Sequence, residues 1–145
     1  MSMYFCNKDK CSFCINNRGW RRIYRLAVMF GLMPKGTLPP ETWSFDEPWE
    51  PMEYFTNEGQ IVTASDALEL ANAIEWALTK LVKEDPDDDP EKKYGSDWEN
   101  ELDRRWKDAM SLGLKNPAYI FFNNRWEERL NELVHFCQQG EFVIY

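Results

Sequence analysis

The sequence predicts an α+β fold, in which about four helices pack on a small, mostly antiparallel sheet. Apolar residues recur at helical spacing in several segments, most clearly over residues 65–83. Residues 54–62 form two short apolar runs around Asn57-Glu58-Gly59, a pattern typical of a β-hairpin with Gly59 at positive φ. Residues 141–145 alternate in polarity and predict a C-terminal strand that joins this hairpin.

A chain of 145 residues, of which 43% are hydrophobic, is long enough to bury one core, so we expect a single domain over residues 1–145. Three segments depart from regular structure. Residues 1–15 are rich in cysteine, and we expect them to be irregular with at most a short strand at Tyr4-Phe5. Residues 84–95 form an acidic loop broken by two prolines.

The third irregular segment, residues 34–53, combines five prolines with Trp43, Phe45, Trp49 and Met52. Proline fixes φ and removes hydrogen-bond donors, so this segment, which we call the strap, is predicted to be a long ordered loop. We expect its aromatic residues to hold it against the body of the domain. Loops of this length without secondary structure are often functional.

Each predicted helix has a start and a stop signal. The first helix begins after Asn16 or Asn17 and ends at Gly31. The second, residues 65–83, follows a cap at Thr63 or Ser65. A capping box formed by Ser96 and Glu99 opens the third helix, which ends at Gly113, and the fourth runs from a cap at Asn123 or Asn124 to Gly140.

The formal net charge of −8 is distributed unevenly. Residues 1–40 carry seven basic groups and one acidic group (7 − 1 = +6), whereas residues 41–145 carry ten basic and twenty-four acidic groups (10 − 24 = −14). Such an acidic surface repels nucleic acid and anionic membranes and favours a basic partner. No apolar stretch of about twenty residues is present, and residues 1–6 lack the pattern of a signal peptide. We therefore expect a cytoplasmic protein whose cysteines are reduced or metal-bound.

Thiolate and imidazole groups are the ligands that Zn²⁺ prefers, and the chain has one histidine and four cysteines. Cys11 and Cys14 form a Cys-x-x-Cys pair. His135 and Cys137 are two residues apart, which separates them by about 200° on a helix, so at most one of them is expected to join the site. Ordinary thiols, or a disulfide or redox role, are the alternatives. The candidate zinc ligands are Cys6, Cys11, Cys14, His135 and Cys137.

The first predicted helix presents a basic, solvated face made of Arg18, Arg21, Arg22 and Arg25. Together with a zinc site it would give a nucleic-acid-binding module. The acidic balance of the remaining chain makes nucleic acid the less favoured partner.

Catalytic signatures are sparse. One histidine excludes mechanisms that need two, and no nucleophile elbow, zinc-protease motif, phosphate-binding glycine loop or dinucleotide fingerprint occurs. The acidic run Asp85 to Glu91 lacks the ligand order of a calcium loop. Carboxylates are abundant, so an enzyme with a carboxylate-lined pocket under the strap is the second alternative.

Tyr54 to Val62, followed by Asp66 to Glu75, resembles a pattern shared by small uncharacterised bacterial proteins. The same proteins are similar at Gly19-Trp20 and at Phe136 to Phe142. This resemblance implies no assigned activity, and it does not include the cysteines at the N-terminus. In size, acidity and aromatic content the chain also resembles immunity proteins, which inhibit toxins by covering a basic surface.

These observations favour a non-catalytic, acidic protein-interaction domain that binds a basic partner protein, and the immunity or inhibitor type is the specific hypothesis. Exposed aromatic residues within a charged rim are typical of binding hot spots. No cofactor is expected, unless the cysteines hold zinc. The predicted contact residues are Trp43, Trp49, Glu50, Asp87, Asp88 and Asp89.

Overall fold

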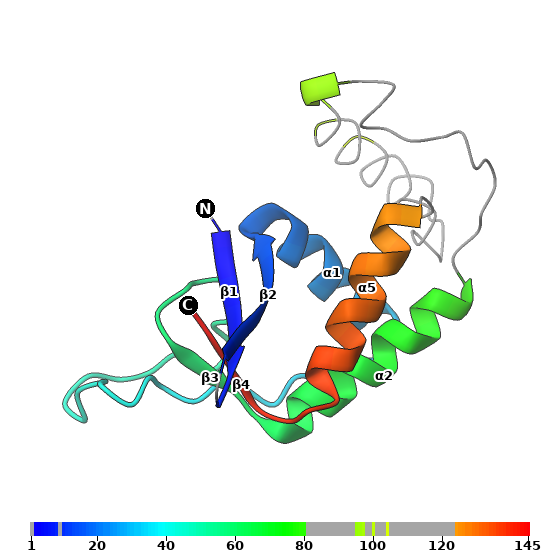
Figure 1. Ribbon diagram of the computed structural model, residues 1–145. Coiled ribbons are helices and arrows are strands. Elements are labelled where there is room, and N and C mark those ends of the chain that lie inside the picture. The colour runs from blue at the N-terminus through cyan, green and yellow to red at the C-terminus, as the bar shows by residue number, and fades with distance from the viewer. Residues whose placement is uncertain (1, 9, 81–94, 98–99, 101–103, 105–123) are drawn as a thin grey trace.

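The computed structural model of the chain describes residues 2–8, 10–80, 95–97, 100, 104 and 124–145. It confirms the α+β class: four antiparallel strands form a sheet in the order β2-β1-β4-β3, and the described helices lie on one side of it (Figure 1). The elements are β1 (Ser2–Asn7), β2 (Lys10–Asn16), α1 (Asn17–Met29), β3 (Gln60–Val62), α2 (Ala64–Lys80), η1 (Gly95–Asp97), α5 (Asn124–Cys137) and β4 (Phe142–Ile144).

Three α-helices lie within the described residues, against the four predicted. The predicted helix from Ser96 to Gly113 falls mostly outside those residues, as do most of the acidic loop 84–95 and the end of the second predicted helix beyond Lys80. The caps predicted for the first two helices are confirmed, whereas of the two candidates for the fourth helix Asn123 lies outside the described residues and Asn124 is the first residue of α5. The Asn16 side chain accepts a hydrogen bond from the Gly19 N–H at 2.7 Å, and Thr63 Oγ1 accepts one from the Asp66 N–H at 3.2 Å.

The expectation that residues 1–15 are irregular is wrong, because β1 and β2 form an antiparallel hairpin. Met3 and Phe5 on β1, and Phe13 and Ile15 on β2, are buried, and the residues between them, Tyr4 and Cys14, are exposed. This alternation is the period-2 pattern of a half-buried strand, and it breaks at Cys6, which is also buried and where the register shifts.

The predicted hairpin over 54–62 is also wrong: only β3 is a strand, and it pairs with β4. The buried side chain of Gln60 accounts for the difference. Its amide donates to the carbonyls of Glu53 (3.3 Å) and Thr56 (2.5 Å), and its oxygen accepts from the Glu58 N–H (2.9 Å). A side chain therefore satisfies backbone groups that strand pairing would otherwise have to satisfy. Gly59 has positive φ, as expected.

The C-terminal strand is confirmed and lies in the middle of the sheet. β4 pairs with β1 on one side and β3 on the other, so the chain ends meet inside the fold (Figure 1). On the helix side of the sheet, aromatic rings stack and cross at centroid distances of 4.9–6.5 Å, among them Phe5, Phe13, Trp20, Phe136 and Phe142. Buried residues from both ends of the chain thus share one core.

Within the described residues, no helix combines the length and apolar character needed to cross a membrane.

Candidate protein-interaction site

The base of the strap is bonded into the fold. Leu38 forms an isolated β-bridge with Ile61, with N–H···O distances of 2.8 and 2.9 Å. The first leg of the strap, by which we mean the segment around Gly36 to Leu38, therefore runs beside β3. The Thr37 N–H donates to the Pro51 carbonyl at 2.6 Å, which joins the first leg to the second leg, the returning segment around Pro51. A Cβ at Gly36 would lie 2.9 Å from Pro51 Cβ, and Gly36 has φ +123°, so only glycine lets the legs approach this closely.

Trp43 and Trp49 hold together residues 43–49, which we call the outer part of the strap. Their rings meet edge to face at 4.9 Å. The indole N–H of Trp43 donates to the Glu47 carbonyl at 3.0 Å, and that of Trp49 donates to the Thr37 carbonyl at 3.2 Å. Both rings are half-buried. The two predicted contact residues therefore order the strap from within, and their polar edges are already satisfied.

The residue that the strap presents to solvent is Phe45, whose relative exposure is 106%. This corrects the expectation that the aromatic residues hold the strap against the body of the domain, because Phe45 is exposed and Trp43 and Trp49 pack on each other. The carboxylates of Asp46 and Glu47 follow Phe45 directly, and Glu50 is exposed further along the same loop. A fully exposed phenylalanine next to carboxylates is an unusual use of a large apolar side chain.

Apart from Lys35 near its start, the strap carries charges of one sign, as does the chain that follows it up to Thr79. From Gly36 to Thr79 the chain has no lysine or arginine. Over the same range it has nine acidic residues: Glu41, Asp46, Glu47, Glu50, Glu53, Glu58, Asp66, Glu69 and Glu75. The strap and the helix that follows it therefore favour cationic ligands.

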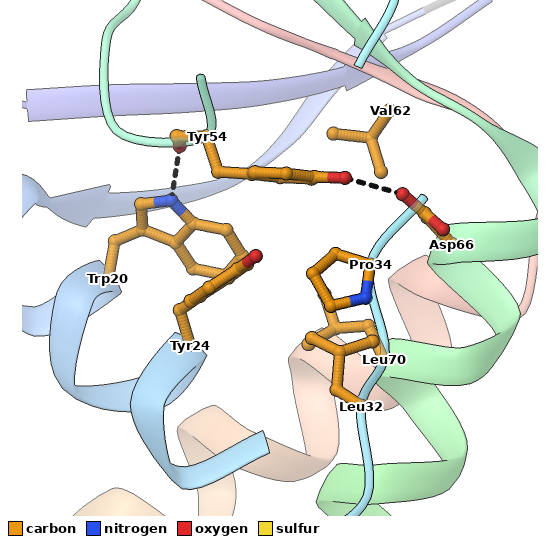
Figure 2. Close-up of a pocket in the computed structure, with 8 residues that line it drawn as sticks. All are labelled: Trp20, Tyr24, Leu32, Pro34, Tyr54, Val62, Asp66 and Leu70. Atoms are coloured by element: carbon orange, nitrogen blue, oxygen red, sulfur yellow. Dashed lines mark hydrogen bonds between the residues drawn. The ribbon is translucent and has the colours of Figure 1, made fainter. Parts of the chain in front are cut away.

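A buried carboxylate anchors the start of the strap to α2. Asp66 is 2% exposed and accepts a hydrogen bond from the Tyr54 hydroxyl at 2.5 Å (Figure 2). It also accepts from the backbone N–H groups of Lys35 (3.1 Å) and Gly36 (3.3 Å). Its position in the first turn of α2 places its charge at the positive end of the helix dipole.

The pKa values of the two tyrosines near Asp66 are raised, first by burial and then by Asp66. Burial, together with the charge of Asp66, raises the pKa of Tyr24 to about 12. Burial, and then the hydrogen bond to Asp66, raise the pKa of Tyr54 well above its usual value of 10. The raised pKa values keep both phenols protonated into the alkaline range, where an ordinary tyrosine would ionise, and Tyr54 acts as a donor to Asp66.

The cavity beside Asp66 tests the prediction of a carboxylate-lined pocket under the strap. Trp20, Tyr24, Pro34 and Tyr54 are among its lining residues, and Figure 2 shows their rings facing one another across it. Its volume is about 10 Å³, room for roughly one water molecule. This space is too small for a substrate, and the Asp66 carboxylate is already fully hydrogen-bonded. We infer that Asp66 stabilises the fold and that this cavity is not the predicted carboxylate-lined pocket.

The candidate zinc ligands are not brought together. Cys6 and Cys11 are joined by a disulfide across the β1–β2 hairpin, contrary to the expectation of reduced or metal-bound thiols. Cys14 is exposed on β2, His135 is exposed on α5, and Cys137 is buried. Burial raises the pKa of the Cys137 thiol and disfavours the thiolate that zinc needs. In the described part of the chain, no three metal-binding side chains form a group.

The predicted arginine face is only partly exposed. Arg22 is 4% exposed, so its placement on a solvated face is wrong. Arg21 donates to Asn17 Oδ1 at 2.8 Å and stacks over the Phe55 ring at 4.6 Å. Arg18 and Arg25 are exposed. Asp87, Asp88 and Asp89 lie outside the described residues.

No family model matches the chain, and no curated protein or solved structure is significantly similar to it.

Proposed function

We propose that the protein is a non-catalytic interaction domain that binds a basic partner protein through the outer part of the strap, and that it acts as an inhibitor of the immunity type. The observation that carries this proposal is Phe45, which is fully exposed on a loop whose base and interior are hydrogen-bonded. An ordered loop loses little conformational entropy on binding, so an exposed apolar side chain on it is an efficient anchor.

The charge of the strap supplies the preference for a basic partner. Between Gly36 and Glu53 it carries five acidic residues and no basic residue. Carboxylates around an aromatic anchor speed association with a cationic surface and disfavour acidic competitors. Inhibitors that cover a basic active site need both properties, which is why we favour this role.

Affinity capture with variants tests the proposal. The immobilised protein is incubated with lysate of its own cells, and retained proteins are identified by mass spectrometry. We expect a basic protein that is retained at low salt and lost at high salt, because exposed charge pairs are screened. Phe45→Ala and the double change Asp46→Asn with Glu47→Gln should each abolish its retention.

The matched control is the double change Glu128→Gln with Glu132→Gln, two exposed carboxylates on α5. It alters the net charge as much as the strap double variant does, so it should leave retention unchanged. Equal loss with both double variants, or retention of only acidic proteins, would contradict the proposal. Retention of nucleic acid by way of Arg18 and Arg25 would instead favour the alternative predicted from the sequence.

A further inference from the structure

A second surface feature, separate from the outer part of the strap, is a groove between the end of α1 and the outer side of α2. Phe30, Met33, Glu69, Asn72 and Trp76 line it, and its volume is about 240 Å³. Trp76 is 56% exposed and Met33 is 77% exposed, so the groove is open to solvent. We call it the Glu69 groove.

One oxygen of the Glu69 carboxylate lacks a hydrogen-bond partner. Among buried side-chain nitrogen and oxygen atoms in the part of the chain that the structure describes, only Glu69 Oε2 has no hydrogen bond. Leaving a buried carboxylate oxygen unpaired costs free energy, which a donor in the groove would recover. The terminal torsion of a glutamate is broad, so a small rotation turns an oxygen toward such a donor.

The aromatic walls of the groove suit a cation with an apolar stem. The rings of Phe30 and Trp76 meet edge to face at 5.8 Å, and more than half of the Trp76 side chain is exposed to solvent. Tryptophan is the most favourable aromatic partner for a cation. Met33 adds a flexible apolar side chain that adapts to the shape of a ligand.

The acidic residues of α2 near the groove also favour a cationic ligand. Glu69 and Glu75 are both on α2, and residues 36–79 include no basic residue, with Lys35 and Lys80 directly flanking this range. A cation entering the groove is therefore attracted chiefly by the carboxylate of Glu69 itself.

We propose that the Glu69 groove binds an arginine side chain of a partner protein. The guanidinium donates hydrogen bonds to the Glu69 carboxylate and stacks on Trp76, while its methylene stem lies against Phe30 and Met33. Arginine fits better than lysine, because its planar guanidinium offers two parallel donors to a carboxylate and stacks on an indole. This site does not depend on the proposed function of the strap.

Nuclear magnetic resonance with a small probe tests this site directly. N-acetyl-arginine methylamide is titrated into the ¹⁵N-labelled full chain, and the indole N–H signal of Trp76, assigned with Trp76→Phe, is followed. We expect a saturable shift of this signal and of the Glu69 and Ala73 amides. The citrulline analogue has nearly the same shape but no charge, so it should cause no saturable shift.

Variants distinguish a direct contact between the Glu69 carboxylate and the arginine probe from a general effect of negative charge on α2. Glu69→Gln should weaken binding of the arginine probe about tenfold, since it removes a charge-assisted hydrogen-bond acceptor. Glu75→Gln removes the same charge from the same helix, where Glu75 accepts from Gln138, and should weaken binding less than about twofold. Phe45→Ala should leave it unchanged. Equal shifts with citrulline, equal effects of the two glutamate variants, or no saturable shift would each overturn the proposal.

Discussion

Asp66 is the residue on which the attachment of the strap depends. Its carboxylate receives a side-chain donor from Tyr54 and backbone donors from Lys35 and Gly36, so one buried group connects α2 to two segments. Each of these bonds is charge-assisted, and together they offset the cost of burying a carboxylate. Its loss would leave several buried donors without an acceptor.

We expect Asp66→Asn to lower the free energy of unfolding by about 2–3 kcal/mol, because an amide must turn one donor toward other donors. Urea unfolding followed by tryptophan fluorescence measures the change. Asp46→Asn, an exposed change of the same kind, should stay within about 0.5 kcal/mol of the wild type. Equal stability of the two variants would show that the Asp66 bonds contribute little.

Tyr24 makes the free energy of unfolding depend on pH in the alkaline range. Its pKa is raised from 10.0 to about 12, so between these values the unfolded chain releases a proton that the folded chain retains. The stability associated with Tyr24 is therefore fully present below pH 10 and is lost as the pH rises toward 12. Urea unfolding at pH 8 and at pH 11.5 should show a smaller loss for Tyr24→Phe than for the wild type. Identical losses would contradict the assignment.

At the scale of elements, the strap is ordered by contacts within itself. The Trp43–Trp49 pair and the bond from Trp49 to the Thr37 carbonyl join segments that prolines keep out of regular structure. The position of Phe45 follows from this internal packing. The binding role that we propose for Phe45 should therefore be sensitive to residues that the partner does not touch.

Trp49→Ala should loosen the strap while most of the fold stays intact, because Trp49 lies outside the buried core. Hydrogen exchange measured by mass spectrometry should show faster exchange over residues 37–50 and unchanged exchange in α2. Retention of the basic partner should fall together with this protection. Thr42→Ala, at an exposed position of the strap, is the control and should change neither. Unchanged strap exchange in Trp49→Ala would refute the internal packing.

The sequence predicted elements whose signals are local. The stripe Ala67, Leu70, Ile74 and Ala77 is buried as expected, and Asn16 caps α1. The sheet was predicted less well, since strand pairing depends on distant partners. Gln60, for example, belongs to β3 as expected, yet its side chain binds the preceding turn, where the sequence predicts the other strand of a hairpin. A single sequence cannot show which carbonyls a buried glutamine will reach.

The candidate site was predicted in part. Proline and tryptophan located the strap, but composition could not distinguish half-buried Trp43 and Trp49 from fully exposed Phe45. The neighbouring Asp46 and Glu47 were a usable signal, because a phenylalanine followed by two carboxylates is poorly suited to a core. Arg22 was misplaced because helical spacing alone does not show which side chains α1 buries.

At the scale of the whole molecule, the sheet joins the ends of the chain. Phe142 on the central strand stacks on Phe5 of β1 at 5.0 Å and crosses Phe136 of α5 at 5.2 Å. Tyr4 and Tyr145 exchange backbone hydrogen bonds of 2.7 and 2.9 Å. The helices cover one side of this sheet, and the strap leaves from its β3 edge. The strap, the proposed binding surface, is thus attached to the sheet through β3.

Phe142→Ala should destabilise the whole fold by about 3–5 kcal/mol, because it opens a cavity between the sheet and α5. Val143→Ala removes a smaller, partly exposed side chain from the opposite side of β4 and should cost much less. Thermal unfolding of both variants measures the difference. Similar midpoints would contradict the observed arrangement of the core.

The most direct measurement of the central claim is site-specific crosslinking from the strap. A photo-crosslinking phenylalanine analogue replaces Phe45 in one sample and Glu128, on α5, in another, and both are irradiated in lysate of the protein's own cells. Our account predicts one basic protein crosslinked from position 45, suppressed by high salt and absent from position 128. No adduct at position 45, or the same adducts from both positions, would contradict it.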